Sequence, residues 1–190
     1  MMTTMALPDI AISVRQPWAW AIVYIGKPLE NRSAAAIKYM APLCGRRAIH
    51  ASKGMTRYEY EHARDFMRSL GIECPPPAEL QRGGIIGSVN VTGVVSQSDN
   101  PWFFGPRALV LTDPKPCDFI PAVGALGYFR WQPADSAIVP KAARWMMTVA
   151  TPKVVVRQTP AKVDDRCADT LEMFCSKGNR SRPSAKSDDC

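Results

Sequence analysis

Residues 10–32 read IAISVRQPWAWAIVYIGKPLENR and hold three elements of the expected fold in one run. Ile10–Val14 has the composition of a strand, and Leu29–Arg32 suits a second strand. Between them, Pro17–Ile25 predicts a helix, because proline is favoured in a first turn and Gly26 follows the last helical residue. This helix is apolar on every side, so we expect it to be buried.

Two further elements follow this run. Arg47–Ala51 suits a third strand. Thr56 to Glu59 has the spacing of a capping box, and the apolar residues after it recur at helical spacing up to Gly71. The apolar stripe consists of Tyr60, Ala63, Phe66, Met67 and Leu70. We therefore expect a well-specified helix between Thr56 and Gly71.

After the prolines at 75–77 the sequence is typical of β structure. We expect a strand over Gly84–Val95 and shorter strands over Ala108–Thr112 and Gly127–Trp131, the latter two bounded by proline and glycine. No strand–helix–strand repeat recurs. Five or six short strands with two or more helices predict an α+β fold, a small β-barrel with helices at its rim.

Composition divides the 190 residues into a folded part and a tail. From Thr151 to Cys190 only six of forty residues are Leu, Ile, Val or Phe, which is below the share that packed cores need. We expect a domain over residues 10–135 and a flexible tail over 151–190 that is disordered or partly helical. Residues 136–150 could pack back on the domain or begin the tail.

Several classes of protein do not fit the sequence. The longest apolar run, Trp18–Ile25, is too short to span a membrane, and the N-terminus lacks the features of a secretory signal. We therefore expect a cytoplasmic protein whose six cysteines are reduced thiols. The sequence has no motif typical of phosphate loops, dinucleotide binding, zinc proteases or serine hydrolases, and we expect no metal and no cofactor.

The basic charge is concentrated near the N-terminus. The chain has a formal net charge of +7, which favours polyanionic partners. Eight Lys and Arg residues lie between Ile10 and Tyr58, against the single acid Glu30, and four aromatic residues lie among them. Cations beside aromatic rings are typical of proteins that bind single-stranded nucleic acid. The alternative is that the rings are core residues and the charges only confer solubility.

Two short clusters could carry chemistry. Side chains alternate along a strand, so Glu30 and Arg32 would share a face, where Glu30 near Lys27 could accept a proton or orient an amine. The alternative is a local ion-pair network that fixes a turn. His50 and Ser52 would also share a strand face, with Lys53 at the strand end, where a barrel mouth offers ligand sites. Purely structural roles stay open for these residues.

Three segments in order resemble the ASCH domain family, a branch of the PUA-like superfamily. They are residues 12–19 (ISVRQPWA), 26–32 (GKPLENR) and 49–53 (IHASK), and residues 84–89, 101–106 and 124–129 agree with the later strands and loops. The resemblance covers about residues 10–131. It implies a compact β-barrel with helices at its rim and a nucleic-acid-binding cleft beside residues 26–32.

Some members of this family are similar to ribonucleases or to acetylcytidine amidohydrolases. In the amidohydrolases, a Lys of this motif, a Thr three residues later and a distant Glu carry the hydrolysis. Lys27 matches the Lys, but Glu30 stands at the Thr position and no distant Glu can be placed. This departure argues against the same mechanism here.

Our first functional hypothesis is the binding of RNA or other single-stranded nucleic acid in a basic cleft. Trp18 or Trp102 would stack on a base, and Glu30 and Asn31 would contact a base edge. The expected nucleic-acid-binding residues are Arg15, Gln16, Trp18, Asn31, Arg32, Ser52 and Trp102.

The second hypothesis is a metal-independent hydrolase that acts on RNA or on an acylated nucleoside. Its expected catalytic residues are Lys27, Glu30, His50 and Lys53. For RNA, Glu30 or His50 would take the 2′-hydroxyl proton, while Lys27 or Lys53 would stabilise charge on the phosphorane. For an amide, Lys27 would act as base or nucleophile. A third hypothesis is an interaction protein that uses the barrel as a scaffold and the tail for contacts.

Overall fold

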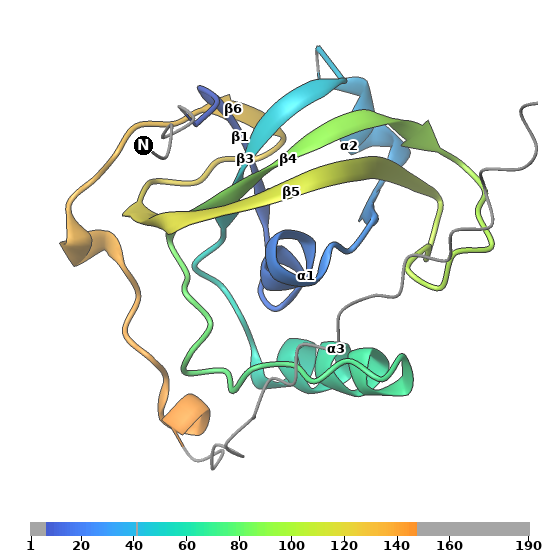
Figure 1. Ribbon diagram of the computed structural model, residues 1–190. Helices are drawn as coiled ribbons and strands as arrows, with labels where there is room; N and C mark the ends of the chain where they lie inside the picture. The colour runs from blue at the N-terminus through green and yellow to red at the C-terminus, as the bar shows by residue number, and fades with distance from the viewer. Residues whose placement is uncertain (1–6, 41, 148–190) are drawn as a thin grey trace, which may run out of the picture. The chain divides into compact units, whose positions relative to one another are not determined.

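The computed structural model describes residues 7–40 and 42–147, which form a mixed α+β fold around a six-stranded sheet curled into a half-barrel (Figure 1). The strands are β1 Ile10–Val14, β2 Leu29–Arg32, β3 Gly45–Ala51, β4 Gly84–Val95, β5 Arg107–Pro121 and β6 Tyr128–Arg130. The helices are α1 Trp18–Ile25, α2 Ala34–Lys38 and α3 Arg57–Ser69, followed by the short 3-10 helices η1 Ser136–Ile138 and η2 Arg144–Met147. The expected α+β class is confirmed.

The sheet has the strand order β2-β5-β4-β3-β1-β6. β1 and β3 are parallel, and every other neighbouring pair is antiparallel. A parallel pair needs a long crossover, which here consists of α1, β2 and α2. As a result, the carboxyl ends of β1 and β3 lie side by side, and Ser13 is the register partner of His50.

Local sequence signals account for where helices α1 and α3 begin and for where α1 ends. Helix α1 begins after Pro17 and ends at Gly26, which has a left-handed φ of 69°. Helix α3 has the expected capping box: Thr56 accepts from the Glu59 N–H, and the Glu59 carboxylate accepts from the Thr56 N–H. Both expected helices are therefore confirmed.

Strand β5 is much longer than the expected Ala108–Thr112, because it continues through two prolines to Pro121. Strand β2 pairs only with residues 107–110 of β5, so the described sheet has no strand beside Pro114 and Pro116 on that edge. Proline is tolerated on such an edge, because the missing N–H removes no bond from the sheet. The short helix α2, capped by the Ser33 side chain, was also not expected.

Three apolar clusters form the core of the described residues, and α1 contributes to two of them. The first joins the sheet to α1, which lies inside the curve of the sheet (Figure 1). The second joins α1 to α3, and Tyr60, Ala63 and Met67 contribute the buried face of α3. The predicted burial of α1 is met only in part: Trp18 and Trp20 are half-buried, and Tyr24 and Ile25 in the last turn are exposed.

The segment after β6 contributes to the second cluster. Met146 is 2% exposed and packs among residues of α1 and α3, so residues 144–147 lie against the folded part. The predicted tail over 151–190 lies outside the described residues. None of the helices in residues 7–40 and 42–147 has the length and apolar character that a membrane span needs.

Candidate functional site

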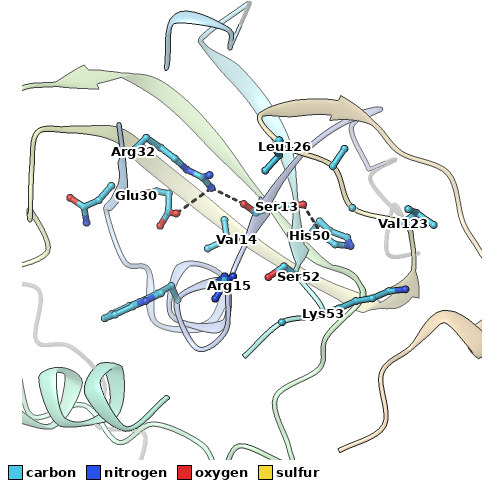
Figure 2. A pocket seen from close by; sticks show the side chains of 15 residues that line it. Ser13, Val14, Arg15, Glu30, Arg32, His50, Ser52, Lys53, Val123 and Leu126 are labelled. Carbon is cyan, nitrogen blue, oxygen red and sulfur yellow. Dashed lines mark hydrogen bonds and ion pairs between the residues drawn. The ribbon is translucent and has the colours of Figure 1, made fainter. Parts of the chain in front are cut away.

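A cavity of about 750 Å³ opens where β1 and β3 end (Figure 2). Four chain segments meet there: the junction of β1 and α1, strand β2, the end of β3, and the loop that follows β5. Eight of the predicted residues line it, namely Arg15, Trp18, Glu30, Asn31, Arg32, His50, Ser52 and Lys53. The rest of the lining consists of Ser13, Val14, Gly54, Val123, Gly124, Ala125 and Leu126. We call this cavity the basic pocket.

Glu30 lies in a buried ion-pair network beside the basic pocket. Its Oε2 accepts from Lys27 Nζ at 2.7 Å, and its Oε1 is 3.3 Å from Arg32 Nη2. The Lys27 side chain is 2% exposed and the Glu30 side chain 12%. The expectation that Glu30 and Arg32 share a strand face is thus met. The local ion-pair network is present as well, and Glu30 and Arg32 also line the pocket.

Lys27 does not line the basic pocket. Its ammonium lies 5.6 Å from the ring centroid of Trp18 and 5.9 Å from that of Trp102, beneath the aromatic side chains. A desolvated cation at this distance from two rings gains cation–π energy in addition to its pairing with Glu30. Lys27 therefore pairs with Glu30 but does not itself contact the basic pocket.

His50 is bonded at both ring nitrogens. Its Nε2 lies 3.0 Å from the Ala122 carbonyl, which only accepts, so Nε2 carries the hydrogen. The Ser13 hydroxyl, 3.0 Å from Nδ1, then donates to the free lone pair. Burial lowers the pKa of His50 from its ordinary value near 6.5; the Ala122 carbonyl opposes this shift, and the charge of Lys53 adds to it. The imidazole is therefore neutral at pH 7.

Arg32 ties two strands together at the pocket wall. Its Nη2 donates to the Ser13 carbonyl at 2.7 Å and also faces Glu30 (Figure 2). Arg15, at the end of β1, forms an ion pair with Glu59 of the α3 capping box. Lys53 has no carboxylate partner among the described residues, so its ammonium is the cation most open to a bound anion.

Asn31 has a structural role that the sequence did not indicate. Its Nδ2 donates to the Trp102 carbonyl at 2.9 Å, and its Oδ1 accepts from the Phe104 N–H at 2.8 Å. With one bond at each end, the amide holds residues 102–104 against β2 rather than standing free to contact a base edge.

Asn31→Ala is expected to lower the free energy of unfolding by about 2 kcal/mol, because the Trp102 carbonyl loses its buried partner. Urea denaturation followed by circular dichroism measures this loss. Asn90→Ala is the matched control, since the Asn90 amide makes no hydrogen bond to the described residues. Equal stability of the two variants would show that Asn31 does not hold the 102–104 segment.

Two predicted binding residues lie away from the basic pocket. Gln16 is buried, donates to the Gln81 carbonyl and accepts from the Trp20 N–H, beside a separate cavity of about 230 Å³. Trp102 is 7% exposed and packs edge-on against Trp18, with ring centroids 6.1 Å apart. Of the two tryptophans, only Trp18 therefore lines the basic pocket.

The loop after β5 is a pocket wall that the sequence did not indicate. Val123 and Leu126 are exposed at the mouth, Leu126 at 97% (Figure 2). A Cβ on Gly124 would lie 2.3 Å from His50 Cε1 and 2.9 Å from Ser13 Oγ. Only glycine allows the backbone this close to the Ser13–His50 pair. In the sequence Gly124 stands before the apolar residues Ala125 and Leu126, but no local pattern relates this glycine to His50.

A scan against protein-family models finds no match to this sequence, and a search of curated proteins finds no similar chain. The ASCH resemblance therefore depends on the ordered motifs at residues 12–19, 26–32 and 49–53. All three contribute residues to the basic pocket: Arg15 and Trp18 from the first, Glu30 and Arg32 from the second, and His50 and Lys53 from the third.

Proposed function

We propose that this protein is an ASCH domain of the PUA-like superfamily that binds single-stranded RNA, with one nucleotide in the basic pocket. The observation that carries the proposal is the composition of that pocket: one aromatic ring, one carboxylate and three cations in a cavity of about 750 Å³. Small-molecule sites range from about 300 to 1,000 Å³, so a nucleotide fits.

The base and the phosphate of a nucleotide each have a chemical partner among the lining residues. The Trp18 ring offers a face for stacking a base, and the Glu30 carboxylate accepts hydrogen bonds from base amino or imino groups. Arg15 and Lys53 supply positive charge for phosphates. Arg32 is engaged with Glu30 and Ser13, so its main role is to orient the carboxylate.

Single strands suit this pocket better than a duplex. A base can enter a cavity of this kind only when it is unstacked, which is the state of bases in loops and single strands. Stacking and backbone contacts give affinity with little sequence preference. We therefore expect single-stranded RNA to bind more tightly than the corresponding RNA duplex.

Lys53→Ala is expected to weaken the binding of a fluorescein-labelled single-stranded RNA, measured by fluorescence anisotropy. Loss of one phosphate contact should reduce the slope of log K against log salt by about 0.7, the value for a single strand. Arg68→Ala removes an equal charge from α3, where Arg68 pairs with Asp65 and does not line the basic pocket, and serves as the control. Identical salt slopes for the two variants would remove Lys53 and the basic pocket from the binding surface.

A further inference from the structure

Ser13 and His50 stand out because they form a hydroxyl–imidazole pair that RNA binding does not require. The two residues are register partners on the parallel strands β1 and β3, and their side chains point toward one another at the pocket wall (Figure 2). A serine hydroxyl that donates to an imidazole, with the imidazole oriented by a third group, is the arrangement of an activated nucleophile. Here the third group is the Ala122 carbonyl.

The direction of each hydrogen bond suits that role. Nε2 must donate to the Ala122 carbonyl, so Nδ1 keeps its lone pair and can take the Ser13 proton. The His50 ring is 1% exposed and packs edge-on against Phe129, which fixes its orientation. The nucleophile and its base are therefore held within hydrogen-bond reach before any ligand binds.

The charged side chains that line the pocket beside the pair carry a net positive charge. The charged side chains that line the same pocket are three cations and one anion: Arg15, Arg32, Lys53 and Glu30. Arg32 donates to the Ser13 carbonyl itself. Lys53, whose charge acts on His50, has no carboxylate partner among the described residues and is the cation available to stabilise the oxyanion of acyl transfer. Lys27, the other potential nucleophile of this region, is engaged in its buried pair with Glu30.

We propose that Ser13 is a catalytic nucleophile and His50 its general base in the hydrolysis of a carboxylic ester carried by a nucleoside or nucleotide. The nucleoside part of this substrate rests on the proposed function, whereas the acylation of Ser13 does not. Ser13 Oγ attacks the ester carbon, and its proton moves to His50 Nδ1. The carbon–oxygen bond to the ribose then breaks, and the leaving hydroxyl takes the proton from His50.

A water molecule completes the cycle. It attacks the acyl carbon of acylated Ser13, and one of its protons passes to His50 Nδ1. The bond between the acyl carbon and Ser13 Oγ breaks, Oγ recovers the proton from His50, and a carboxylic acid is released. No metal, oxidant or reductant takes part, and the atoms of ester and water balance those of acid and alcohol.

A biotinylated fluorophosphonate tests the nucleophile directly on the wild-type chain. Attack by Ser13 Oγ displaces fluoride and leaves a stable phosphonyl ester, which mass spectrometry of tryptic peptides assigns to a residue. We expect one adduct per chain, on Ser13, and none in Ser13→Ala. Labelling of other residues but not Ser13, or no labelling at all, would overturn the proposal without the need for any variant.

Hydrolysis of p-nitrophenyl acetate and of 2′(3′)-O-acetyl adenosine then tests turnover. Ser13→Ala should lose at least 100-fold in kcat/KM, and His50→Gln should lose a similar factor. Ser69→Ala changes an exposed serine in the last turn of α3 and should match the wild type. Circular dichroism of each variant checks its fold. Turnover by Ser13→Ala equal to that of the wild type would also refute the proposal.

The pH profile separates a general base from a structural histidine. The neutral imidazole is the active form, and burial lowers its pKa below 6.5. Acylation should therefore stay constant as the pH falls through 6.5 and decline only at lower pH. An unchanged rate well into the acidic range would contradict this role. If RNA binds but Ser13 is not labelled, only this inference fails; if Ser13 is labelled but RNA does not bind, only the proposed function fails.

Discussion

Lys27→Met is expected to lower the free energy of unfolding by about 3 kcal/mol, measured by urea denaturation. The Glu30 side chain is only 12% exposed, and the substitution leaves it with Arg32 as its one cationic partner. Removing one member of a buried ion pair is strongly destabilising, because the remaining charge is desolvated without full compensation. The cation–π contacts with Trp18 and Trp102 are lost as well.

The double variant Lys27→Met/Glu30→Gln is the control for this explanation. It removes the buried carboxylate together with its partner, so it should recover more than half of the stability lost in Lys27→Met. A double variant no more stable than the single one would show that packing of the Lys27 stem, rather than the charge of Glu30, determines the loss.

Trp18→Leu is expected to weaken the binding of single-stranded RNA by ten- to a hundredfold, in the same anisotropy measurement. Stacking of one base on an aromatic ring contributes about 1–3 kcal/mol. Leucine retains much of the apolar packing that Trp18 makes with the first two core clusters, so the fold should persist.

Trp20→Leu, two residues along the same helix, is the matched control. Trp20 lines the smaller cavity beside Gln16 and not the basic pocket. The Trp20→Leu variant should leave RNA affinity unchanged, although it loses the same side-chain volume as Trp18→Leu. Equal losses of affinity in the two variants would mean that the effect comes from α1 itself and not from a ring in the pocket.

Elements with strong local signals could be predicted from the sequence. The bounds of β1, β2 and β4 match the expected ranges, and Pro17, Gly26 and the Thr56 capping box delimit α1 and α3. The full length of β5 could not be predicted, because proline tolerance depends on which neighbours a strand has. The neighbours of β5 are known only once the strand order of the sheet is known.

The same distinction between local and long-range contacts applies to the candidate site. Strand alternation predicts that Glu30 and Arg32 share a face, and the contact with Lys27 is also local, because Lys27 lies three residues before Glu30. The bond between Ser13 and His50 depends on the parallel pairing of strands 37 residues apart, which no local pattern encodes. The positions of Gln16 and Trp102 also follow from long-range packing, with Gln81 and Phe66 respectively.

The position of β1 between β3 and β6 has a consequence for the order in which the chain folds. Among the described strands, β1 is made before both of its partners, which begin at Gly45 and Tyr128. At ordinary rates of synthesis, about 5–20 residues per second, β1 waits several seconds for β6. The strand that holds Ser13 is thus made before either of its neighbours, so this wall of the pocket is complete only after residues 128–130 have been made.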